Sequence, residues 1–131
     1  MVDFGGNRRR YCAGDPEELI DLVDTINDPS VGVCIDTGHA HFAGISAGDF
    51  IRMAGKRLKC LHIDDNNRDD DAHLPPYMGS IDWADVMRAL GEVGYKNDFS
   101  FEVGSFRIPD AMRGSWCRYM YDLGKSLIDL I

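Results

Sequence analysis

The sequence predicts an α/β fold in which short parallel strands alternate with helices. Its three apolar runs have the length of strands and span Val31–Asp36, Leu58–Asp64 and Phe99–Val103. Amphipathic segments with helix-capping residues precede, separate and follow these runs. Alternation of this kind, with short connections, is typical of parallel strands joined by right-handed crossovers.

The first helix is predicted to follow an N-terminal segment without periodicity. Residues 1–14 are rich in Gly and Arg and are expected to form a loop or a frayed end. Asp15 is the expected N-cap, and Pro16 occupies the first helical position. Apolar residues then recur at helical spacing as far as Ile26, and Pro29 lies beyond the predicted helix end.

Two more helices are predicted between the strands. Ser46 is the expected cap of a short helix that stops at Gly55, and Asp82 caps a longer helix that ends near Gly94. The first strand is expected to end in a sharp turn at Thr37-Gly38.

A polar loop, Asp65–Ser80, separates the second strand from the helix that follows it. Loops of this length in compact domains are usually functional or disordered. After the third strand, a loop through Pro109 leads to a long final helix whose apolar residues run from Trp116 to Ile131.

Composition and charge narrow the class of protein. The chain has 131 residues, which fits one domain, residues 1–131, and its net charge is −8. That charge argues against non-specific nucleic-acid binding, and the single basic cluster, Arg8–Arg10, is expected to be solvated. No apolar run approaches the length of a membrane span, and no secretory signal is recognisable, so a cytoplasmic location without a membrane partner is expected.

The four cysteines are widely spaced and contain no C-x-x-C pair: Cys12, Cys34, Cys60 and Cys117. Cys34 and Cys60 fall inside predicted buried strands. We therefore expect reduced thiols that pack in the core of a cytoplasmic protein, without a disulfide framework.

Three metal-ligating side chains stand at the ends of the three predicted strands. Asp36, His62 and Glu102 occupy these positions, and the carboxyl ends of parallel strands face the ligand in such folds. Carboxylate and imidazole together suit a divalent ion such as Mn, Zn, Co or Mg. Each residue also has a simpler interpretation: Asp36 as a turn cap and His62 as a core histidine. Glu102 between two apolar residues is harder to explain in this way, because a buried, unpaired carboxylate is costly.

Other polar residues lie close to these strand ends in the sequence. His39 and Arg68 are positioned to reach the same cavity, and Asp71 and His73 can share one face of an extended loop, where they would bind a second metal or a substrate hydroxyl. The alternative for the loop aspartates is a solvated charge run, and His41 is assigned to packing.

Five segments together resemble one family: Gly32–Ala40, His62–Asn66, Asp71–Pro75, Gly79–Trp83 and Phe101-Glu102. They are similar to the C-terminal half of the xylose isomerase-like TIM-barrel superfamily, over residues 11–131. That group includes sugar isomerases and epimerases, inosose-converting enzymes and apurinic endonucleases of the endonuclease IV type. The resemblance implies about three parallel strands with flanking helices, as the C-terminal part of an incomplete (β/α)8 barrel.

The resemblance also implies roles for the site residues. Asp36, His62 and Glu102 match three of the four metal ligands, and Glu102 matches a glutamate that shuttles protons in ketose 3-epimerases. His39 and Arg68 match contacts to substrate oxygens. The Asp71 and His73 pair matches ligands of an additional zinc in the endonuclease branch.

One departure from the family pattern shapes the expected activity. The fourth ligand, a glutamate on the preceding strand, has no counterpart here, and a complete barrel needs about 250 residues. We therefore expect a fragment or a natural half-barrel that joins a missing N-terminal half or forms a homo-oligomer.

Three functions remain open at this point. The first is metal-dependent isomerisation or epimerisation of a sugar, sugar phosphate or polyol by proton transfer, with little or no turnover in this chain alone. The second is an apurinic endonuclease-like phosphodiesterase, which the acidic charge disfavours. The third is a non-catalytic half-barrel that binds metal or a partner.

Overall fold

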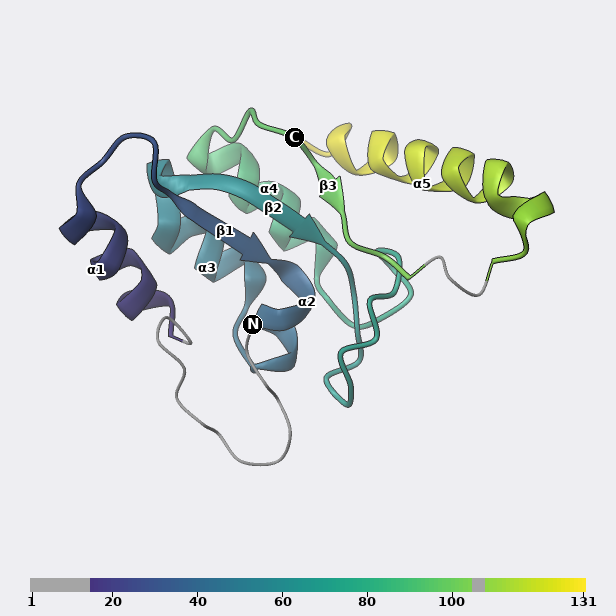
Figure 1. Ribbon diagram of the computed structural model, residues 1–131, viewed down its shortest axis with the longest axis horizontal. Helices are drawn as coiled ribbons and strands as arrows, with labels where there is room; N and C mark the ends of the chain where they lie inside the picture. The colour runs from purple at the N-terminus through teal and green to yellow at the C-terminus, as the bar shows by residue number, and fades with distance from the viewer. Residues whose placement is uncertain (1–14, 105–107) are drawn as a thin grey trace.

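The computed structural model describes residues 15–104 and 108–131, which form a parallel sheet with helices on one face (Figure 1). The sheet has the order β1-β2-β3, with β1 at Val33–Asp36, β2 at Leu58–Ile63 and β3 at Ser100–Phe101. Both pairings are parallel. The predicted α/β class with three parallel strands is therefore confirmed, whereas the predictions for residues 1–14 lie outside the described residues.

The helical elements follow the predicted order with three additions. They are α1 (Pro16–Ile26), α2 (Thr37–Phe42), α3 (Ala47–Ala54), the 3-10 turn η1 (Gly55–Arg57), α4 (Trp83–Val93), the 3-10 turn η2 (Asp110–Met112) and α5 (Arg113–Ile128). The elements that the sequence did not predict are the two 3-10 turns and α2. No helix among the described residues is long and apolar enough to cross a membrane.

The predicted capping residues begin and end the helices as expected. Asp15, Ser46 and Asp82 each accept a hydrogen bond from a backbone N–H two or three residues ahead. Asn27 and Gly94 follow α1 and α4 in the left-handed conformation, with φ of 48° and 68°. Local sequence therefore sets these helix ends.

The sheet departs from the prediction at both outer strands. After β1, the expected sharp turn at Thr37-Gly38 is replaced by α2, because the Asp36 side chain accepts a hydrogen bond from the His39 amide at 2.7 Å and so caps a helix. β3 is shorter than predicted, so Glu102 lies one residue beyond it.

Side chains alternate between a covered and an open face of the sheet. Val33 and Ile35 in β1 and Leu61 in β2 are at most 1% exposed, and they pack among the residues of the helices that lie behind the sheet in Figure 1. On the opposite face, Cys34 is exposed and Cys60 is half-buried. The prediction that these two thiols pack in the core was therefore wrong, because helices cover one face of the described sheet.

The long loop after β2 is organised around one buried carboxylate. Asp65 is fully buried, and its backbone forms a two-way bridge with Leu74 through hydrogen bonds of 2.8 and 2.9 Å. Its side chain accepts hydrogen bonds from the backbone amides of Asn66 and Ile81 and from the indole N–H of Trp83, at 2.9, 3.1 and 2.8 Å. The Asp65 carboxylate thus fastens the loop to the start of α4.

Replacing this carboxylate should therefore weaken the attachment of the loop to α4 and destabilise the domain. We expect Asp65→Ala to lower the free energy of unfolding by roughly 3 kcal/mol or more, because three buried N–H groups lose their acceptor. Urea denaturation followed by circular dichroism measures the loss. Asp69→Ala, at an exposed position of the same loop, should stay within about 0.5 kcal/mol of the parent. Equal stabilities for the two variants would contradict this account.

Candidate metal centre

One buried side chain, Thr37, aligns the carboxyl ends of β1 and β2. Thr37 donates a hydrogen bond from Oγ1 to the Asp64 carbonyl at 2.7 Å and accepts one from the Asp64 amide at 3.0 Å. The register places Asp36 opposite His62. Beyond β3, the amide of Glu102 donates to the carbonyl of Ile63 at 3.0 Å, which extends the alignment to the third strand.

This alignment brings together the three predicted metal ligands. One ligand atom from each of Asp36, His62 and Glu102 lies within 4.8 Å of the others. The Nδ1 atom of His62 is 2.5 Å from Glu102 Oε2 and 3.8 Å from Asp36 Oδ2. The arrangement mixes carboxylate oxygen and imidazole nitrogen at one point, which is the donor set of borderline divalent cations.

The two oxygens of Asp36 have different environments. Oδ1 caps α2, as described above, so Asp36 caps a helix and not the turn that the simpler interpretation expected. Oδ2 is buried and has no hydrogen-bond partner among the described residues, although imidazole nitrogens of His39 and His62 lie 3.3 and 3.8 Å away. Burial raises the pKa of Asp36 against the opposing effect of the His39 amide. A bound cation would satisfy the unpartnered oxygen.

His62 and Glu102 are more exposed than the sequence suggested. Their side chains are 45% and 48% exposed, because both lie on the open face of the sheet. The expectation of a buried Glu102 was wrong, and the alternative of a core histidine does not fit His62. The exposure leaves both side chains accessible to a ligand.

A second group of candidate ligands adjoins the first. One ligand atom from each of His39, Asp71 and His73 lies within 4.8 Å of the others. Asp71 Oδ2 is 3.1 Å from Nε2 of His39 and 3.5 Å from Nε2 of His73, and Nδ1 of His39 faces Asp36 at 3.3 Å. His39 therefore connects the two groups, and the predicted Asp71 and His73 pair lies beside the strand ends.

In the described part of the chain, the side chain of Arg68 contacts His41 and not these two groups. Its backbone has a left-handed φ of 68°, and its Nε donates to Nδ1 of His41 at 3.4 Å. Nε2 of His41 in turn lies 2.8 Å from Ser80 Oγ. Burial, followed by the Arg68 charge, lowers the pKa of His41. His41 is 7% exposed and packs as predicted, whereas a substrate contact by Arg68 stays a prediction.

Sequence reasoning did not assign a role to Asp64, whose carboxylate lies beside His73 of the second group. Its side chain is fully buried, and neither carboxylate oxygen has a hydrogen-bond partner among the described residues, although Oδ2 is 2.9 Å from His73 Nδ1. Burial, and next the charge of Asp36, raises the pKa of Asp64 to about 8. Its position two residues after His62, at the end of an apolar strand, is the signal that could have revealed it.

The raised pKa of Asp64 predicts how the stability of the metal-free chain depends on pH. Because its folded-state pKa of about 8 exceeds the ordinary 3.8, the folded chain holds a proton between these values that the unfolded chain has released. The free energy of unfolding should therefore fall as pH rises across this window, and Asp64→Asn should reduce that slope. Urea titrations in EDTA at about pH 5 and pH 8 measure it. Asp69→Asn should keep the parent slope; an unchanged slope in Asp64→Asn would be inconsistent with this pKa.

A parallel β/α sheet with candidate ligands at the carboxyl ends of its strands is typical of the (β/α)8 barrel class. The chain belongs to the xylose isomerase-like TIM barrel family, whose model matches residues 4–124. It is 37% identical over 86 residues to the D-psicose 3-epimerase of Enterocloster bolteae, an alignment that covers 66% of this chain and 27% of the relative. Other matching relatives are named inosose isomerase.

Solved structures share the fold over nearly all of this chain. The D-psicose 3-epimerase from Clostridium cellulolyticum H10, crystallised with D-tagatose, superposes with a TM-score of 0.76 at 21% identity, covering 91% of this chain and 45% of that one. A zinc-containing IOLI protein has a TM-score of 0.63 at 26% identity, covering 87% and 42%. The chain thus spans less than half the length of these relatives, and the three-stranded sheet is the corresponding part of their barrels.

Proposed function

We propose that this chain carries part of the active site of a metal-dependent sugar or polyol epimerase or isomerase, in which Glu102 transfers a proton. The observation that carries the proposal is the convergence of Asp36, His62 and Glu102 at the strand ends. The names of the relatives, D-psicose 3-epimerase and inosose isomerase, support the substrate class.

Asp36, His62 and Glu102 would hold a divalent cation such as Mn, Zn, Co or Mg. The fit follows from the unpartnered, buried Oδ2 of Asp36 and from the mixed oxygen and nitrogen donors. The zinc bound by the IOLI protein supports the same choice of cofactor. When bound, such an ion polarises a substrate carbonyl and makes the neighbouring C–H bond more acidic.

Glu102 is the carboxylate best placed to exchange a proton with a substrate. Its side chain is 48% exposed, against 12% for Asp36, 35% for Asp71 and none for Asp64. General-base catalysis requires direct approach to the proton, and the exposed carboxylate permits this. His39, through its contacts with Asp36 and Asp71, would orient substrate oxygens together with Arg68.

Inversion of a stereocentre needs acid–base groups on both faces of the substrate, whereas exchange of a proton on one face needs one. Within residues 15–104 and 108–131, Glu102 is the most exposed carboxylate of the site. We therefore expect this chain to exchange a substrate proton with solvent while producing little or no epimer.

The experiment measures deuterium incorporation from heavy water at C3 of D-psicose and D-tagatose, the stereocentre beside the carbonyl. With Mn²⁺ present, the parent chain should exchange this position faster than Mn²⁺ alone, and Glu102→Gln should slow exchange by about 100-fold or more. Manganese binding, measured by electron paramagnetic resonance, should weaken in Asp36→Asn.

The control is Glu92→Gln, an exposed position on α4 outside the site, which should match the parent in both measurements. Exchange no faster than with free Mn²⁺, in a chain that binds both metal and sugar, would rule out the proposed proton transfer. Tight Mn²⁺ binding that is unaffected by Asp36→Asn would rule out the proposed ligands.

The group of His39, Asp71 and His73 favours an additional role beside this centre. Two imidazoles and a carboxylate within 4.8 Å can hold a second divalent ion or bind a substrate hydroxyl. A second ion would suit the phosphodiesterase alternative, but the net charge of −8 disfavours a nucleic-acid substrate. A sugar or polyol therefore remains the preferred ligand, and a non-catalytic half-barrel is the outcome if exchange fails.

The open edge and open face of the sheet suggest that the chain associates with another protein chain. Within the described residues β1 pairs with β2 alone, and Cys34 lies exposed on the uncovered face. We propose that a second copy pairs with the open edge of β1, so that two half-barrels enclose this face as a lumen that small ligands still enter, through an apolar contact well above about 1,000 Å² in total.

Sedimentation velocity at micromolar concentration should accordingly show a dimer. Cys34→Glu places a charge on the open face and should dissociate the dimer, whereas Cys117→Glu on the exposed side of α5 should not. A monodisperse parent monomer would exclude the homo-oligomer.

A further inference from the structure

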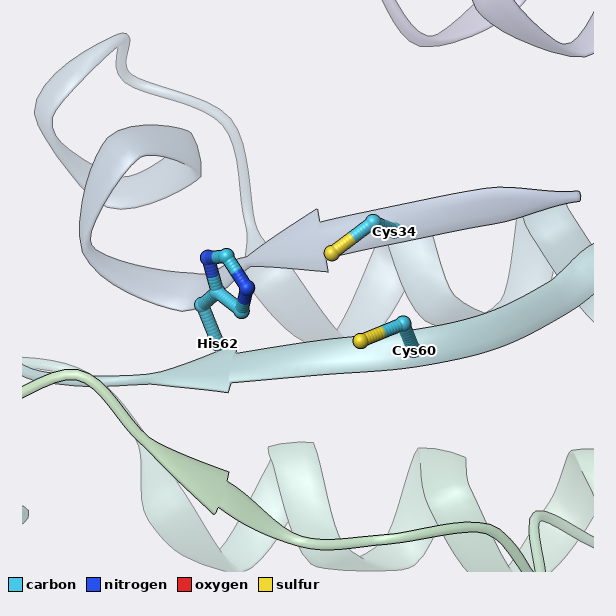
Figure 2. A group of neighbouring side chains, drawn as sticks. All are labelled: Cys34, Cys60 and His62. Carbon is cyan, nitrogen blue, oxygen red and sulfur yellow. The ribbon is translucent and has the colours of Figure 1, made fainter.

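Two cysteines stand side by side on the open face of the sheet, next to the metal centre. Cys34 in β1 is paired in register with Cys60 in β2, and His62 follows two residues later in the same strand. Because side chains alternate along a strand, Cys60 and His62 share one face. Figure 2 shows both sulfur atoms and the His62 ring on that face.

The three side chains are close enough to share a cation. One ligand atom from each of Cys34, Cys60 and His62 lies within 4.8 Å of the others. Donors around a tetrahedral zinc ion lie about 3.8 Å apart, given a Zn–S distance near 2.3 Å. Because Cys34 is exposed, its side chain can rotate to shorten the larger of these separations. Cys60 is otherwise held by a weak contact to the Leu61 carbonyl at 3.9 Å.

We propose that Cys34, Cys60 and His62 form a binding site for a thiophilic divalent cation of the zinc class. Two thiolates and one imidazole are soft and borderline donors, which favour zinc over Mn²⁺ or Mg²⁺ and leave a fourth position open. On binding, the cation replaces the two thiol protons, which pass to the buffer. No oxidation is involved, and both cysteines remain reduced.

His62 links this site to the carboxylate centre. Its Nδ1 atom lies 2.5 Å from Glu102 Oε2, and a ring nitrogen faces the two sulfur atoms in Figure 2. A neutral imidazole offers one unprotonated nitrogen at a time, so it can serve one cation. Occupation of the thiol site therefore withdraws His62 from the carboxylate centre; this competition, unlike the thiol site itself, rests on the proposed function.

The test uses the reduced, metal-free 131-residue chain and Co²⁺ as a spectroscopic probe for zinc. Thiolate ligation produces an ultraviolet charge-transfer band that carboxylate ligation does not. We expect this band to saturate at one Co²⁺ per chain and to disappear when Zn²⁺ is added. Cys34→Ser and Cys60→Ser should each reduce the band at saturation by about half or more and weaken Co²⁺ binding by more than about 10-fold.

Two sets of controls separate this site from other possibilities. Cys117→Ser, at an exposed position on α5, should leave the band unchanged. Asp36→Asn and Glu102→Gln should also retain it, so failure of the carboxylate centre would not imitate failure of the thiol site. Absence of the band in the parent chain, or its persistence at full intensity in either Cys34→Ser or Cys60→Ser, would overturn the proposal.

A second measurement on the parent chain avoids any effect of substitution on folding. Alkylation of the native protein, followed by mass spectrometry, reports how fast each cysteine reacts. Zn²⁺ should slow the reaction of Cys34 and Cys60 by more than about 10-fold and leave Cys117 unaffected. Equal rates with and without Zn²⁺ at Cys34 and Cys60 would equally overturn the proposal.

Discussion

The site depends on the alignment of β1 with β2, which Thr37 fixes through its two hydrogen bonds to the backbone of Asp64. Each residue of a strand advances the chain by about 3.3 Å, so a slip of one residue would move Asp36 away from His62 by that distance and turn alternate side chains to the other face. Thr37 is fully buried, and its hydroxyl is both donor and acceptor. A residue with no apparent chemistry thus determines whether the ligands meet.

Features encoded by neighbouring residues could be predicted from the sequence. The caps at Asp15, Ser46 and Asp82 and the three strand ends with candidate ligands belong to this class, because a short pattern is sufficient to specify each of them. Helix α2 escaped prediction because Thr37-Gly38 is a common turn signal, whereas the helix depends on the side chain of Asp36.

Contacts between residues in the middle of neighbouring strands could not be predicted. The proximity of Cys34 to Cys60 joins residues from two strands, and the register shifts between Val33 and Cys34. No local pattern reports such a shift. The exposure of these thiols likewise depends on which face of the sheet the helices cover, and an apolar run gives no information on that choice.

Asp64 and Asp65 show how two identical neighbours acquire opposite properties. Asp65 receives three N–H donors and serves as a fastening point for the loop, whereas both oxygens of Asp64 lack hydrogen bonds among the described residues. Asp64 can approach the candidate ligands because Gly38 in α2 has no side chain. A Cβ atom on Gly38 would stand 1.7 Å from Asp64 Oδ1, so the carboxylate fills the space that a side chain at position 38 would need. The side chains of residues 38 and 64 therefore compete for the same space. During evolution, a larger residue at position 38 would require a smaller or differently oriented side chain at position 64.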